Sequence, residues 1–333
     1  MKKLILFFLL FPLISSAKGL SQELAFNLNR SIVKVHAANQ AGNHGVGSGV
    51  VIAKDHVVTN CHVIANATGI HITKYGTSYP PEELIADWYH DICILTFKYL
   101  DLDPVQLGSS DNVDYATDVI AKSYGGNATR PVTSVGKVRD MFDFKGKKII
   151  QSSTWFSLGA SGGGLFDIEG RLLGITTFKT PGHGALYYSI PVEVVKDLLK
   201  KGQRVKVTTQ ASAPFWDEPP EQLPFFMRIV KPLLDEDWSE LNKLSQEWVS
   251  KEWVSKENVL EANYYLAKSF YHLNQKDEAK KLLMKVINQK SKHSMAHQLL
   301  SKIYQDEGNQ VESEYHANLF MELDSEIQEF NKN

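Results

Sequence analysis

The sequence predicts a multidomain β + α protein, in which a β-rich domain is followed by an all-α helical domain. Between about Ser31 and Val195, short β-prone runs alternate with Gly, Asn and Asp, a spacing typical of a sandwich or barrels. Residues 203–224 contain four prolines and little periodicity, and after them apolar residues recur every three or four positions. We therefore predict a signal peptide (1–17), a β-rich domain (18–202), a linker (203–224) and a helical domain (225–333).

The first residues have the pattern of an export signal. Lys2 and Lys3 precede an apolar run over residues 4–14, and Ser15-Ser16-Ala17 places small residues before a cleavage point. The run is too short to span about 30 Å of hydrocarbon. We expect cleavage after Ala17 and a secreted or periplasmic mature chain without a membrane anchor, in a compartment that permits disulfides.

Composition excludes several protein classes. The 333 residues are 43% apolar and 22% charged, which is ordinary for a globular protein and unlike collagen, low-complexity disorder or a disulfide scaffold. Lys+Arg (36) and Asp+Glu (38) nearly balance, which argues against nucleic acid as a partner. The only cysteines, Cys61 and Cys93, exclude a four-Cys zinc site. We expect neither metal nor cofactor.

The C-terminal region contains a 34-residue repeat. Leu266 and Leu300 correspond, as do Phe270 and Tyr304, and Val286 and Phe320, within predicted helices over 260–273, 277–288, 293–304 and 310–323. The pattern resembles a tetratricopeptide repeat over about residues 236–328, although the early Trp and closing Pro are missing. A generic stack of helical hairpins stays open as the alternative. Either arrangement predicts a groove for a peptide or protein partner.

Three segments in the β-rich domain carry chemistry in the order His, Asp, Ser. They are Val57-Val-Thr-Asn-Cys-His62-Val-Ile64, Trp88-Tyr-His-Asp91-Ile-Cys-Ile-Leu95 and Leu158-Gly-Ala-Ser161-Gly-Gly-Gly-Leu165. Together they resemble trypsin-like serine proteases of the chymotrypsin clan, and most closely the HtrA/Deg branch, over about residues 28–202. The resemblance implies a chymotrypsin-like fold of two six-stranded β-barrels with the catalytic triad in the cleft, and polypeptide substrates. The apolar pattern of residues 192–201 separately predicts a helix that closes this domain.

The residue types suit acyl transfer. A Ser hydroxyl needs a base near neutral pKa, and the base needs an acceptor that holds its tautomer. We predict Ser161 as nucleophile, His62 as general base and then acid, and Asp91 as orienting acceptor. The amides of Gly159 and Ser161 would form the oxyanion hole. The alternatives are a plain Gly-rich turn, a capping Asp and a structural His.

One departure from the digestive members concerns activation. They carry Asp immediately before the nucleophile, whereas this chain has Ala160, so we expect no activating cut. No Gly-Leu-Gly-Phe-like loop follows residue 205, so we do not expect the PDZ modules that are usual in the HtrA branch. For the same reason, we do not extend the cage assembly of that branch to this chain. The non-enzymatic alternatives are an inactive scaffold or adaptor and a holding chaperone.

The cysteines and the specificity pocket are less constrained. If Asp91 lies against His62, Cys61 and Cys93 become neighbours, and either a disulfide or two buried thiols would fit.

Trp155 stands where cleavage after Lys or Arg would need Asp. The resemblance implies a shallow apolar pocket, with barrel core as the alternative reading, and Thr177 is a candidate donor to Asp91. The residues assigned to substrate binding are Trp155, Thr177, Phe178, Lys179, Leu186 and Tyr188.

Overall fold

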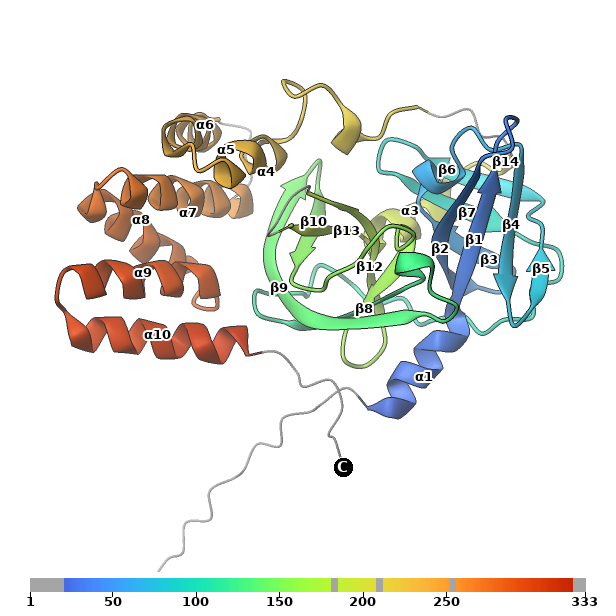
Figure 1. Cartoon of the computed structure of the whole chain (residues 1–333), viewed down its shortest axis with the longest axis horizontal. Helices are drawn as coiled ribbons and strands as arrows, with labels where there is room; N and C mark the ends of the chain where they lie inside the picture. Colours follow the sequence, from blue (N-terminus) through green and yellow to red (C-terminus); the bar gives the residue numbers. More distant parts are fainter. Residues whose placement is uncertain (1–20, 181–184, 208–211, 252–255, 326–333) are drawn as a thin grey trace, which may run out of the picture.

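The structure is a computed structural model that describes residues 21–180, 185–207, 212–251 and 256–325. The predicted signal peptide lies outside the described residues. An N-terminal sheet, a closed barrel and a set of helices follow one another across the molecule (Figure 1). The barrel lies between the sheet and the helices.

The N-terminal sheet has eight strands in the order β14-β6-β7-β3-β2-β1-β4-β5. A helix, α1 (Gln22–Ser31), precedes it, and a short helix, α2 (Cys61–Ile64), follows β3. The strands are β1 (Ile32–Ala38), β2 (His44–Ala53), β3 (His56–Thr59), β4 (Gly69–Lys74), β5 (Thr77–Tyr79), β6 (Glu83–Asp87), β7 (Ile92–Thr96) and β14 (Val205–Lys206).

The expectation of two six-stranded barrels is wrong for this first sheet. Its edge strands are β5 and β14, and no strand pairing joins them within the described residues. Pro80 and Pro81 directly follow β5, and proline cannot donate to a β-ladder, so the chain leaves the sheet there. The opposite edge is completed by β14, which pairs with β6 and comes from the range that the sequence predicts as a linker.

The second sheet is a closed barrel in the order β10-β13-β12-β11-β8-β9. Helix α3 (Val192–Lys201) follows it and buries Val192, Val195 and Leu198, as the predicted closing helix requires. The barrel strands are β8 (Asp118–Ser123), β9 (Val132–Phe144), β10 (Lys147–Ser152), β11 (Gly163–Phe166), β12 (Leu172–Lys179) and β13 (Tyr187–Pro191); a 3-10 turn, η1 (Gly125–Asn127), follows β8.

The C-terminal part is helical throughout the residues described there. Helices α7 and α8 pack as one hairpin and α9 and α10 as another, with the 34-residue register of the sequence repeat. The elements are η2 (Phe215–Asp217), α4 (Phe225–Arg228), α5 (Val230–Leu234), α6 (Trp238–Ser250), α7 (Lys256–His272), α8 (Lys276–Gln289), α9 (Ser294–Asp306) and α10 (Gln310–Asp324).

The helices pack directly on the barrel. Helix α7 contacts β9, where the Tyr265 hydroxyl donates to Oδ2 of Asp140 at 3.1 Å. Phe226 of α4 stacks on Phe142 of β9 with ring centroids 4.6 Å apart. Both aromatic rings are buried, so apolar surface of the barrel is covered by the helical part.

Candidate active site

Pairing of β3 with β7 brings the His and Asp segments together. Thr59 lies opposite Cys93 in this ladder, which places the residues just after β3 beside those just before β7. Asp91 has a φ of +60°, a left-handed conformation that Asp tolerates better than most residues. Its carbonyl accepts the Cys61 N–H at 3.2 Å. The turn therefore directs the Asp91 side chain toward α2 and His62.

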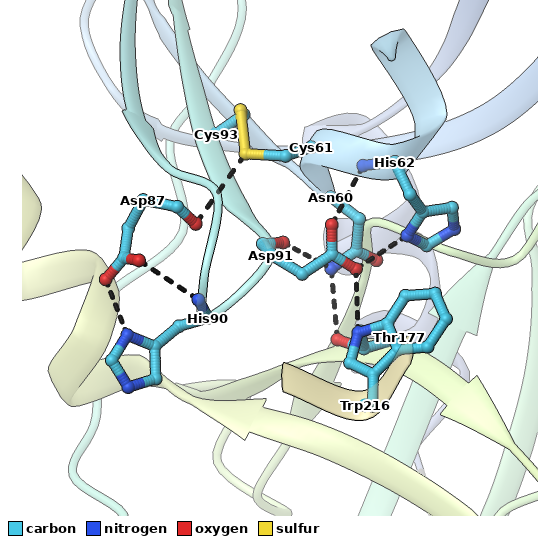
Figure 2. The surroundings of a disulfide bond; sticks show 9 residues. All are labelled: Asn60, Cys61, His62, Asp87, His90, Asp91, Cys93, Thr177 and Trp216. Atoms are coloured by element: carbon cyan, nitrogen blue, oxygen red, sulfur yellow. Dashed lines mark hydrogen bonds and ion pairs between the residues drawn. A yellow bond between two sulfur atoms is a disulfide. The ribbon is translucent and has the colours of Figure 1, made fainter. Parts of the chain in front are cut away.

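His62 and Asp91 form a two-point contact. Oδ1 of Asp91 accepts the backbone N–H of His62 at 2.8 Å, and Oδ2 lies 2.6 Å from Nδ1 (Figure 2). Asp91 is 1% exposed and His62 is 31% exposed. Because a carboxylate only accepts, Nδ1 carries the proton, and Nε2 of the neutral ring keeps a lone pair. The ring is held in the tautomer that a general base requires.

Strand β2 supports the turn that carries Ser161. The Ser161 carbonyl accepts the Ser48 N–H at 2.8 Å, and the Ser48 hydroxyl donates to the Gly159 carbonyl at 2.8 Å. Gly162 has a φ of +88°, and a Cβ there would collide with the Ser48 carbonyl. Glycine is therefore required after Ser161 for this close approach.

The turn leaves two amides without partners. Among the residues that the structure describes, neither the Gly159 nor the Ser161 N–H donates a hydrogen bond. The φ of Gly159 is +89°, in the left-handed region that favours glycine. By contrast, the intervening Ala160 amide donates to the Ser157 carbonyl at 3.0 Å. Two donors thus stay free in a turn where the Ala160, Gly162 and Gly163 amides are engaged.

The Ser161 hydroxyl donates to the Thr177 carbonyl at 3.2 Å, and within the described chain no hydrogen bond joins it to His62. The Thr177 hydroxyl accepts from Nδ2 of Asn60 at 3.0 Å. Asn60 lies two residues before His62, so Thr177 of β12 links the serine turn of the barrel to the histidine segment of the first sheet.

The expectation that Thr177 donates to Asp91 is wrong. The Thr177 hydroxyl donates to the Ile175 carbonyl at 2.8 Å. Asp91 instead accepts from Trp216, whose indole N–H lies 3.3 Å from Oδ2 (Figure 2). The Trp216 ring meets His62 edge-on, with centroids 5.4 Å apart and planes at 88°. Sequence reasoning missed this residue; the only signal was an aromatic pair within the proline-bearing linker.

The comparisons with known proteins agree with this geometry. Residues 47–175 match the family model described as a trypsin-like peptidase domain. This segment is therefore similar to a trypsin-like peptidase domain.

Curated relatives match about half of the chain. A probable periplasmic serine endoprotease DegP-like of Pseudomonas fulva is 31% identical over 162 residues, 46% of this chain and 34% of the relative. Serine endoprotease DegS of Haemophilus influenzae is 26% identical over 191 residues, 54% of this chain and 56% of the relative. The chain thus spans about a third to just over half of these relatives.

A solved structure agrees with the fold. The active form of the Rv3671c protease from M. tuberculosis superposes with a TM-score of 0.52 at 20% identity, covering 63% of this chain and 99% of that chain. In the part of the chain that is described, no helix is both long and apolar enough to cross a membrane.

A disulfide adjoins the His62–Asp91 pair. Cys61 and Cys93 are bonded, with Cα atoms 4.9 Å apart and both side chains buried. Cys61 precedes His62, and Cys93 follows Asp91 by two residues (Figure 2). The bond therefore ties together the two segments that carry the pair.

A second His–Asp pair adjoins the first. Oδ1 of Asp87 accepts the His90 N–H at 3.0 Å, and Oδ2 lies 2.6 Å from Nδ1 of His90. Nε2 of His90 is buried without a partner among the described residues. Burial raises the pKa of the Asp87 carboxyl, but the side-chain and backbone hydrogen bonds from His90 outweigh it, so the net pKa lies below the usual value.

The predicted specificity residues do not line one cavity. Trp155 is 54% exposed and lines a 180 Å³ pocket with Phe156, whereas Leu186 lines a 450 Å³ pocket toward α7. A third pocket, of 440 Å³, is lined by Phe178, Lys179 and Tyr188, together with Trp216. Thr177 is buried and lines none of these three pockets.

One buried cluster has residue types that bind metals. Asp140 of β9, Glu261 of α7 and His293 before α9 place one ligand atom each within 4.8 Å of one another. However, Nδ1 of His293 accepts the Ala296 N–H at 3.1 Å, which puts the imidazole proton on Nε2, the atom that faces the carboxylates. The protonated Nε2 therefore has no lone pair with which to bind a cation. Burial raises the pKa of both carboxyls.

Proposed function

We propose that the chain is a serine endopeptidase that hydrolyses peptide bonds through Ser161, His62 and Asp91 by way of an acyl-enzyme. The observation that carries this proposal is the two-point contact of buried Asp91 with His62, which leaves Nε2 as the basic atom. Thr177 adds support, because it contacts both the Ser161 hydroxyl and Asn60 near His62.

The chemistry requires one side-chain rotation. The Ser161 hydroxyl turns from the Thr177 carbonyl to Nε2 of His62, which takes its proton as Oγ attacks the scissile carbonyl carbon. The free amides of Gly159 and Ser161 would donate to the resulting oxyanion. His62 then gives the proton to the leaving amine, and water hydrolyses the acyl-enzyme by the same steps.

The domain needs no activating cut in this proposal. Ala160 occupies the position where a carboxylate would pair with a newly formed N-terminus, and it is fully buried. With no acid there, insertion of an N-terminus gains nothing. Regulation must then come from elsewhere in the chain.

We propose polypeptide substrates that bind as an added strand along β12. Strand β11 pairs with β12 only up to Thr176, so within the described chain Thr177, Phe178 and Lys179 have no strand partner on that side. Trp155 replaces the acidic residue that would favour Lys or Arg before the scissile bond. Cleavage-site profiling with a proteome-derived peptide library would establish the preference.

We propose that the mature chain begins after Ala17 and acts in the periplasm or outside the cell. The curated relatives include proteins named as periplasmic, and a disulfide suits an oxidising compartment. The two C-terminal hairpins are proposed to be tetratricopeptide-like repeats that bind a peptide or protein partner. In this division the linker is 203–224 and the helical domain 225–333.

A fluorophosphonate probe with the Ser161→Ala variant tests the peptidase directly. We expect the probe to label folded wild-type protein at Ser161, and the variant to lose labelling and about 10⁶-fold in turnover while its thermal unfolding stays unchanged. The Ser161–Thr177 bond favours a second candidate, an inactive scaffold. Unlabelled, correctly folded wild-type protein would support the scaffold and overturn the peptidase.

A further inference from the structure

The carboxylate of Asp91 has a donor that comes from outside the sheet and the barrel. Oδ2 accepts the Trp216 indole N–H at 3.3 Å and lies 2.6 Å from Nδ1 of His62. Oδ1 is already engaged by the His62 backbone N–H. Since Asp91 is 1% exposed, water has little access, and the indole supplies a third donor to a buried charge.

The Trp216 ring is held by aromatic packing. It stacks on Phe178 of β12 with centroids 5.7 Å apart and planes at 26°, and Phe178 in turn stacks on Tyr188 at 4.8 Å. The residue before it, Phe215, is 1% exposed, and its N–H donates to the Tyr89 carbonyl at 2.9 Å. The indole is therefore anchored from two sides.

We propose that Trp216 is a positioning residue for the His62–Asp91 pair, which makes the segment between the barrel and the helices part of the catalytic apparatus. The inference rests on the proposed peptidase function. The indole N–H fixes the plane of the Asp91 carboxylate, and its ring edge limits the rotation of His62. Both effects keep Nε2 oriented toward the nucleophile. Thr177 cannot supply this donor, because its hydroxyl donates to Ile175.

The N–H also withdraws charge from Oδ2. A carboxylate oxygen that carries less negative charge stabilises a protonated imidazole less. Loss of the indole N–H should therefore make protonation of His62 easier. That effect changes the pH dependence of the reaction, which a residue serving only to pack the segment would not do.

The matched variants are Trp216→Phe, which keeps an aromatic ring without the N–H, and Trp238→Phe as a control. Trp238 lies in α6, where it stacks on His272 at 3.7 Å, away from the site. We expect Trp216→Phe to lower kcat/KM for a short peptide substrate by about 5- to 20-fold, mostly through kcat, as expected for loss of a hydrogen bond to a charged group. The control should match wild type.

The second readout is the acid limb of the pH profile of kcat/KM. We expect Trp216→Phe to move its midpoint to higher pH by several tenths to about one unit. In parallel, the NMR resonance of the proton between His62 and Asp91 should shift in Trp216→Phe and stay in place in Trp238→Phe. This signal reports the contact whether or not the protein hydrolyses peptides.

A variant with the rate, the acid limb and the proton resonance of wild type would overturn the inference while leaving the peptidase intact. Wild-type protein without hydrolysis or probe labelling would instead refute the proposed function. If Trp216→Phe unfolds, 3-benzothienylalanine at position 216 repeats the test, because its sulfur replaces the indole N–H in a ring of the same size.

Discussion

The two His–Asp pairs of the N-terminal sheet share one geometry and differ in their surroundings. In each pair a carboxylate accepts both the backbone N–H and Nδ1 of its histidine, at 2.8 and 2.6 Å for His62 and at 3.0 and 2.6 Å for His90. His62 is 31% exposed, whereas Nε2 of His90 is buried without a described partner.

Under the proposed function, this difference separates catalytic chemistry from structural support. A histidine oriented by a carboxylate becomes a general base only if its second nitrogen can reach a substrate or nucleophile. The His90 ring is instead enclosed by aromatic neighbours, with its centroid 6.4 Å from that of Phe144 and 6.5 Å from that of Phe215. We therefore assign the chemistry to His62 and a structural role to His90.

The largest expected effect comes from replacing the aspartate of each pair by asparagine. Asp91→Asn should lower kcat by about 10⁴-fold, because the amide no longer enforces the basic tautomer of His62. Asp87→Asn should change kcat by less than about three-fold and instead lower the free energy of unfolding by about 1–3 kcal/mol. Peptide hydrolysis and urea unfolding of the two variants measure both effects; equal losses of kcat would contradict the assignment.

Removing the disulfide behind both pairs should act on stability more than on chemistry. The bond closes a loop with a sequence separation of 32, for which chain entropy predicts a contribution of about 3–4 kcal/mol. The double variant Cys61→Ala/Cys93→Ala should lose that stability in guanidinium unfolding and keep kcat within about ten-fold below its melting temperature. Loss of activity without loss of stability would show that the bond orients His62.

The smallest expected effect is the contribution of the Asp87 pair to the pH dependence of stability. The pKa of the Asp87 carboxyl is below its usual value of 3.8 when the protein is folded. Its contribution is therefore present above about pH 4 and is lost as the pH falls through the lower, folded value. Urea unfolding between about pH 5 and pH 2.5 should decline less steeply in Asp87→Asn; an unchanged slope would refute this assignment.

Sequence reasoning located the His62, Asp91 and Ser161 segments because each adjoins a strand with a clear β pattern. It placed the closing helix and the helical hairpins for the same reason, since their apolar periods are local. It missed α1, although Ser21 caps that helix by accepting the Leu24 N–H at 3.0 Å, a local signal that was available. Strand β14 was missed because two residues carry no period.

The contacts that depend on long-range packing could not be predicted. Trp216 reaches Asp91 across 125 residues, and no spacing rule connects a linker residue to a catalytic carboxylate. The division of the predicted specificity residues among three pockets likewise depends on how the helices pack on the barrel. The enclosure of His90 is of the same kind, because Phe144 and Phe215 come from distant segments.

The position of η2 has a practical consequence for preparing fragments. A protein shortened after Gly202, where the predicted β-rich domain ends, would retain His62, Asp91 and Ser161 yet lack the indole and phenyl rings of Trp216 and Phe215. Such a fragment would expose Asp91 to water and measure a site different from that of the full chain. The shortest piece that preserves the environment of both histidines extends to Asp217, the last residue of η2.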